Sequence, residues 1–194
     1  MISELLELCR VLFAAVDRLR QEYRGLRATS SRRETLILYY TLHQLCGLCQ
    51  EMVRAIDDQQ RPLDVLGKRF LADQLAILTR CFVKTLEQIR ALDVETKTLE
   101  IYVPDLVEFC FEPFGPTRAV LGGAEQPTRL TMCAEELLKD SAKIDDFRNA
   151  TAILAAGVQK LREFIRTTMT PDEVRLLTRR LPAEITGDWL KLLE

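Results

Sequence analysis

The feature that most constrains this chain is the spacing of its apolar residues, which recur at alternating steps of three and four. A helix with this spacing carries one narrow apolar stripe, which it buries against other helices. The stripes comprise Ile2, Leu5, Cys9, Leu12, Val16, Leu19, Tyr23 and Leu26; Leu38, Leu42, Leu45, Cys49, Met52 and Ile56; Leu71, Leu75, Leu78, Phe82, Leu86 and Ile89; and Ile144, Phe147, Thr151, Leu154, Val158, Leu161 and Ile165. The sequence therefore predicts a bundle of long helices.

Polar breaks and helix-start signals between the stripes divide the chain into four long helices. We predict helices over residues 2–26, 31–56, 62–92 and 142–168. The second opens on an S-x-x-E capping box at Ser31, and the third begins with a proline at its first position. Because the first two connections are short, neighbouring helices should run antiparallel.

The segment 94–128 departs from this pattern. It holds four prolines and a Gly-Gly pair, which disfavour a long regular helix. Leu99, Ile101 and Val103 alternate as in a strand, although no partner strand is evident. We predict an irregular crossover with one or two short helices before the fourth long helix.

The C-terminal segment 170–194 reads as a short helical tail. Thr170, Pro171 and Glu173 supply a cap, a first-turn proline and an acid at the third position, which together favour a helix start. Pro182 then divides the tail into two short helices. The predicted fold is all-α: an antiparallel four-helix bundle over residues 1–169, with the tail packed on it.

Composition indicates an unsecreted chain without a membrane span. No run of about eighteen apolar residues occurs. Glu4 and Glu7 stand where a signal peptide would be positively charged and then apolar. The six cysteines are scattered, which favours free thiols in a reducing compartment. A cytoplasmic location is the expectation, and the net charge of −2 neither favours nor excludes a polyanionic partner.

The only histidine begins the tempting pattern His43-x-x-Cys46-x-x-Cys49. On one helix, His43 and Cys49 lie about 120° and about 9 Å apart, so they cannot share one zinc ion. A redox role is also disfavoured because Cys46 lies far from a helix N-terminus. We expect Cys49 in the core, Cys46 on its flank and His43 on the exposed side, and we predict no metal site and no cofactor.

Patterns that mark helical enzymes do not occur. No residue pairs with His43 in a Glu-x-x-His motif, and the Asp57-Asp58 and Asp145-Asp146 pairs lack the third aspartate of a magnesium-binding run. Phosphate-binding glycine loops and Gly-x-Ser-x-Gly are missing from the sequence. The interpretation is therefore a non-catalytic protein.

Two regions are candidates for contact with a partner. Arginines crowd one pole of the predicted bundle, at Arg18, Arg20, Arg24, Arg27, Arg32 and Arg33. Some complement a helix C-terminus, but Arg32 and Arg33 sit at a helix start, where positive charge is unfavourable. This cluster suggests, as an alternative function, binding of nucleic acid or nucleotide phosphate.

The favoured candidate is an apolar surface on the crossover and tail. Its residues are Phe109, Phe111, Phe114, Leu177 and Trp189. The phenylalanines can fold onto the bundle or anchor a partner. The tail can close the bundle as a lid or dock on a partner or a second copy. The sequence thus favours an interaction subunit that binds a protein partner or forms a homo-oligomer through these segments.

Overall fold

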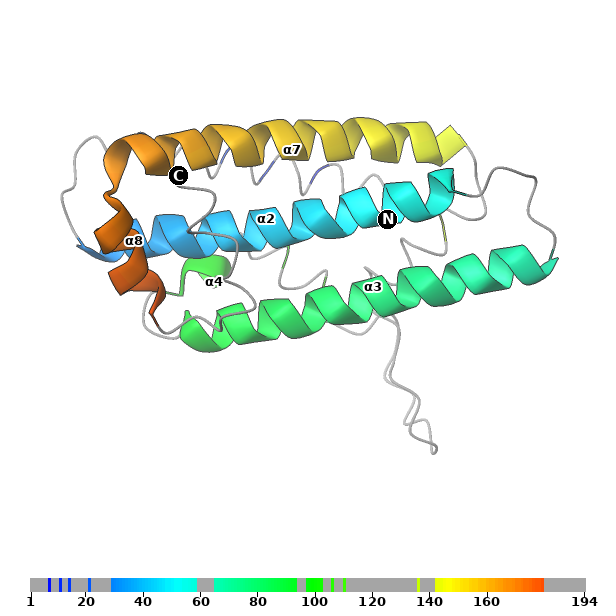
Figure 1. The fold of residues 1–194 in the computed structure, drawn as a ribbon, viewed down its shortest axis with the longest axis horizontal. Helices are drawn as coiled ribbons and strands as arrows, with labels where there is room; N and C mark the ends of the chain where they lie inside the picture. The colour runs from blue at the N-terminus through cyan, green and yellow to red at the C-terminus, as the bar shows by residue number, and fades with distance from the viewer. Residues whose placement is uncertain are drawn as a thin grey trace.

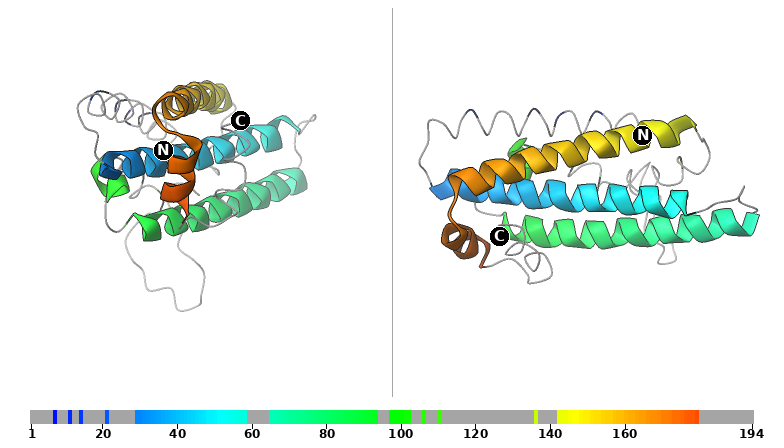
Figure 2. Two further views of the ribbon diagram at one scale, coloured as in Figure 1. Left: turned by 60° about the vertical axis from the view of Figure 1, so that its left-hand side comes forward. Right: turned by 45° about the horizontal axis from the view of Figure 1, so that its top comes forward.

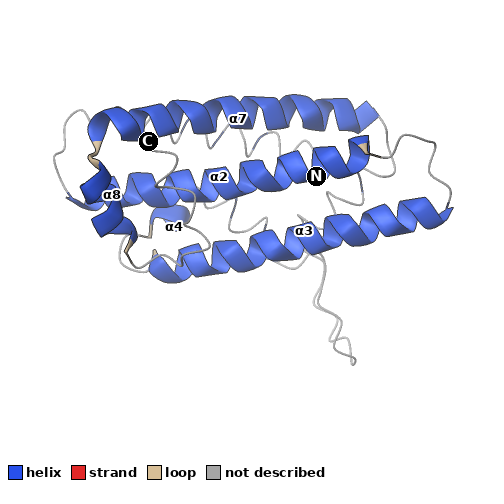
Figure 3. Ribbon diagram, in the orientation of Figure 1, coloured by secondary structure: helices blue, strands red, loops and turns tan. Residues whose placement is uncertain are grey.

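A computed structural model describes residues 29–58, 65–93, 97–102 and 142–179, together with isolated helical positions at Glu7, Val11, Ala14, Gln21, Leu106, Cys110 and Glu136. Its helices are α2 (Thr29–Asp57), α3 (Val65–Leu92), α4 (Thr98–Tyr102), α7 (Ala142–Thr168) and α8 (Pro171–Thr178). The described residues contain no strand, as Figure 3 shows, so the predicted all-α class is confirmed.

The three long helices lie side by side, with α2 between α7 and α3 (Figure 1). The colour gradient shows that α2 runs opposite to both neighbours, so α3 and α7 are parallel to each other. A long return connection is what allows two helices of a bundle to run parallel. Whether a fourth long helix completes the bundle is a prediction that falls on residues outside the described ranges.

Helix boundaries follow the sequence signals closely in the C-terminal half. The prediction of a helix over 142–168 is confirmed by α7, and the Thr170 cap begins α8. The predicted Ser31 cap is wrong, because α2 begins at Thr29 and Ser31 lies in its first turn. Within the predicted first helix the structure describes only Glu7, Val11, Ala14 and Gln21, which are helical. The start at Pro62 and the second helix of the tail lie outside the described residues.

The strand-like alternation of Leu99 and Ile101 does not form a strand, because both residues lie in α4. The carboxylate of Asp93, at the end of α3, accepts hydrogen bonds from the backbone N–H groups of Thr98 (2.9 Å) and Leu99 (2.7 Å). These are first-turn donors that a helix cannot satisfy itself. Lys97, with a positive φ of 50°, turns the chain into this arrangement. A single buried side chain therefore starts α4.

The predicted stripes form the core. The buried stripe residues are Leu38, Leu42, Leu45, Cys49 and Met52 of α2, Leu71, Leu75, Phe82, Leu86 and Ile89 of α3, and Phe147, Thr151, Leu154, Val158, Leu161 and Ile165 of α7. Ile56, Leu78 and Ile144 are partly buried against the same cluster. The helical periodicity therefore identified the inward face of each described long helix.

The buried face of α2 is nevertheless wider than the narrow apolar stripe predicted for it. Every residue from Thr35 to Leu42 is buried, including the off-stripe Leu36, Ile37, Tyr39 and Tyr40. A helix buried on all sides needs neighbours on all sides. Besides α3 and α7, the short helices α4 and α8 contact α2, and Figure 2 shows them on opposite faces of its N-terminal half. This half of α2 is the centre of the molecule.

Candidate interaction site

Helix α8 has a buried inner face and a capped N-terminus. Val174 and Thr178 are buried, and the Thr178 hydroxyl donates to the Val174 carbonyl at 2.7 Å. At its start, the Thr170 side chain accepts from the Glu173 N–H at 3.3 Å, and Glu173 accepts from the Thr170 N–H at 2.9 Å. This reciprocal capping box satisfies two donors of the first turn. The helix therefore presents a defined outer face.

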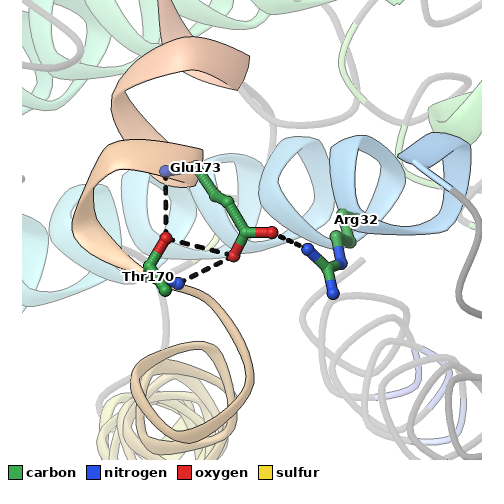
Figure 4. A network of polar contacts seen from close by, with 3 residues as sticks. All are labelled: Arg32, Thr170 and Glu173. Carbon is green, nitrogen blue, oxygen red and sulfur yellow. Dashed lines mark hydrogen bonds and ion pairs between the residues drawn. The ribbon is translucent and has the colours of Figure 1, made fainter.

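The same Glu173 joins α8 to α2 (Figure 4). One carboxylate oxygen, Oε2, serves Thr170, while Oε1 accepts from the Nη1 group of Arg32. Arg32 lies in the first turn of α2, where a positive charge opposes the helix dipole. Glu173 offsets that unfavourable placement. Arg32, whose charge at a helix start was unexplained by the sequence, therefore makes a structural contact between the N-termini of α2 and α8.

For the predicted phosphate site, the structure describes only two of six arginines. Arg32 is engaged by Glu173, and Arg33 is half-buried. Arg18, Arg20, Arg24 and Arg27 lie outside the described residues. Phosphate binding by the arginine cluster stays a prediction. The charge of Arg32 is already paired with Glu173, so the cluster offers phosphate one cation fewer than the sequence suggests.

Exposed apolar side chains occur on both short helices at this end of the molecule. Leu176 of α8 is 69% exposed and Ile101 of α4 is 64% exposed. Leu177, which the sequence favoured as a partner contact, is partly buried against the core, whereas its neighbour Leu176 faces outward. Phe109, Phe111, Phe114 and Trp189 lie outside the described residues. At this end of the molecule, the exposed apolar side chains therefore belong to the crossover and the tail, at residues that the sequence did not name as partner contacts.

The histidine–cysteine pattern is part of the core. Cys46 is buried rather than flanking, and burial raises the pKa of its thiol, which keeps it protonated. His43 is half-buried rather than exposed, and its ring stacks on Tyr39 with centroids 5.7 Å apart. Cys49 is buried as expected. In the described part of the chain, no group of three or more His, Cys, Asp or Glu is arranged to hold a metal ion.

An open groove lies between α2 and α3, away from α8. Its volume is about 510 Å³, and it is lined by Glu51, Arg54, Ala55, Asp58, Gln74, Ile77 and Leu78. The polar side chains include an exposed ion pair between Arg54 and Glu51 at 2.5 Å. Its lining residues include two carboxylates, Glu51 and Asp58, and no cysteine, serine or histidine. Sequence reasoning missed it, because a groove between helices depends on how the helices pack.

Comparison with known proteins gives no relative: no protein-family model, curated protein or solved structure matches this chain significantly. Among the described helices, none has the length and apolar character that crossing a membrane would require. Function must therefore be argued from the surfaces described above.

Proposed function

We propose that this protein is a non-catalytic, cytoplasmic interaction subunit: a helical scaffold, completed as an antiparallel four-helix bundle by residues 2–26, that binds a protein partner through its crossover and C-terminal segments. The observation that carries the proposal is the pair of outward apolar side chains, Ile101 on α4 and Leu176 on α8. Each belongs to a short helix whose other face packs on α2.

Rigid presentation is what makes these side chains suitable anchors. Leu99 is buried in α4 and Val174 in α8, so each short helix is held by its inner face. A side chain displayed on a fixed helix loses little freedom on binding, which favours affinity. Because α4 and α8 cover opposite faces of α2 (Figure 2), a partner that contacts both must wrap around this end of the bundle.

The test is capture of partners from the native cell on tagged protein, followed by mass spectrometry. We expect a partner at defined stoichiometry that binds the wild type and is lost with Leu176→Asp. Ile153→Asp is the matched control, because Ile153 is a large apolar residue on α7 with 55% exposure. Circular dichroism should show both variants folded, since surface substitutions of this kind change stability little.

Two results would contradict the proposal. One is the absence of any stoichiometric partner with the wild-type protein. The other is a partner that binds Leu176→Asp and Ile101→Asp as well as it binds the wild type. A partner lost equally with Ile153→Asp would show that the contact lies elsewhere on the bundle.

The arginine cluster supplies the alternative proposal, a site for nucleic acid or nucleotide phosphate. Binding through it should weaken steeply with salt, because phosphate contacts release counterions. The informative variant is Arg24→Glu with Arg27→Glu, which leaves the Arg32–Glu173 contact intact. Oligonucleotide affinity that is undetectable, or unchanged in this variant, would remove the alternative.

A further inference from the structure

The outer face of α3 carries apolar residues that the core does not use. Phe70 is 60% exposed and Ile77 is 55% exposed. They are seven residues apart, so they lie on the same side of the helix, about 10.5 Å from each other along its axis. The core residues of α3, such as Leu75 and Leu86, lie on the opposite side. Phe70 and Ile77 thus form a row of exposed apolar side chains on one face of α3, against which a second helix could pack.

Charged residues on this face have a particular order around Ile77. Asp73 precedes Ile77 by one turn, and Arg80 and Lys84 follow it; all three are exposed. At 100° per residue, Phe70, Asp73, Ile77, Arg80 and Lys84 fall within an arc of about 80°. The acidic residue lies about 6 Å before Ile77 along the axis, and Arg80 lies about 4.5 Å after it.

That order is self-complementary. If a second α3 lies antiparallel to the first, with a two-fold axis at Ile77, each Asp73 faces Arg80 of the second copy. Phe70 then lies beside the aliphatic stem and ammonium of Lys84 of the second copy, a favourable cation–aromatic contact. An isologous interface requires one surface to supply both members of every pair, and this face supplies them at matched distances.

We propose that the occupant of this face is a second copy of the same chain, so that the protein forms an antiparallel homodimer through α3, centred on Ile77. The proposal goes beyond the partner surface on α4 and α8, because it uses a different helix. The groove lined by Ile77, Gln74 and Asp58 borders the interface and is narrowed by the second copy.

Sedimentation equilibrium of the full chain at concentrations up to about 1 mM tests the dimer. We expect reversible association, and we expect Ile77→Lys to raise the dimer dissociation constant at least tenfold. The matched control is Ile153→Lys on α7, which has the same 55% exposure and should leave the constant unchanged. Circular dichroism of both variants checks that they are folded.

Exchanging the charges of Asp73 and Arg80 tests the alignment of the two α3 helices in the dimer. Asp73→Arg and Arg80→Asp should each weaken the dimer about three- to tenfold, because each places like charges together. The double variant should return to within about twofold of the wild type, since the pairs are restored with reversed polarity. A monomeric wild type, an equal effect of Ile153→Lys, or a double variant as weak as the combined single variants would each overturn the proposal.

Discussion

Arg32 and Glu173 connect the first turns of α2 and α8, although 141 positions separate them in the chain. The second carboxylate oxygen of Glu173 accepts a hydrogen bond from the Thr170 backbone N–H at 2.9 Å. The carboxylate is thus oriented by its own helix and aimed at another. Residues that occupy unfavourable positions in their own helix, such as Arg32, can be explained by such tertiary partners.

Two replacements of Glu173 distinguish its role in capping α8 from its ion pair with Arg32. Glu173→Ala should lower the free energy of unfolding by about 1–2 kcal/mol, because it removes the ion pair and the side-chain half of the capping box. The bond from the backbone N–H at position 173 to the Thr170 hydroxyl remains. Glu173→Gln should cost less, about 0–1 kcal/mol, because glutamine retains the cap while losing the charge. Urea denaturation measures both. The control is Asp172→Ala, which removes a first-turn carboxylate and its exposed pair with Arg175 but leaves the capping box and the Arg32 contact in place. A cost equal to that of Glu173→Ala would refute the assignment.

The Asp93 carboxylate should be worth more than any exposed carboxylate in the described ranges. Asp93→Ala leaves the N–H groups of Thr98 and Leu99 without their acceptor inside the protein, which should cost about 1–3 kcal/mol. Asp146→Ala, at an exposed position of α7, should change stability by less than about 0.5 kcal/mol. Thermal unfolding followed by circular dichroism compares the two, and equal midpoints would contradict the role given to Asp93.

Burial on every side of α2 between Thr35 and Leu42 predicts a loss of stability for a substitution off the apolar stripe. Leu36→Ala should lower stability by about 2–5 kcal/mol, as Leu38→Ala should, because both side chains are fully buried. Leu176→Ala, at an exposed position on α8, should lie within about 0.5 kcal/mol of the wild type. If Leu36→Ala behaves like Leu176→Ala, then the face of α2 that bears Leu36 is not buried.

Alkaline pH should destabilise the protein through Tyr40. Burial raises the pKa of Tyr40, and the electrostatic effect of the nearby Tyr39 raises it further. A side-chain hydrogen bond with Thr178 lowers this pKa in part. The folded state therefore keeps the Tyr40 proton after the unfolded chain loses it, at a pKa of about 10. Stability is fully present below that pH and falls above it, by up to about 1.4 kcal/mol per pH unit for this one group, until the folded pKa is reached.

Equilibrium denaturation between neutral and strongly alkaline pH measures this dependence. Tyr40→Phe should reduce the slope above about pH 10, whatever its cost at neutral pH, because phenylalanine has no proton to lose. Tyr39, whose pKa burial also raises, leaves a residual slope in that variant. An unchanged slope in Tyr40→Phe would show that Tyr40 is not the group responsible.

Sequence reasoning succeeded where the signal is local. The buried stripe of α7 and the helix start at Thr170 depend on residues a few positions apart, and the structure has both as expected. It failed at Ser31, where α2 begins earlier. It also failed at Leu99, because the alternation of apolar residues did not indicate the helix that the Asp93 carboxylate, six positions earlier, starts. It also placed Cys46 and His43 further outward than they are, because the stripe counted only one buried side of α2.

The sequence by itself determined that this chain folds into long amphipathic helices, because the three-and-four spacing gives each helix an apolar face that water disfavours. Only the tertiary structure decided which helix lies at the centre, since α3, α4, α7 and α8 all contact α2, whose segment from Thr35 to Leu42 is buried on every side. It also decided which apolar residues remain outside. Leu176 and Leu177 look alike in the sequence, and which of the two is exposed follows from the face of α8 that the neighbouring helices leave uncovered.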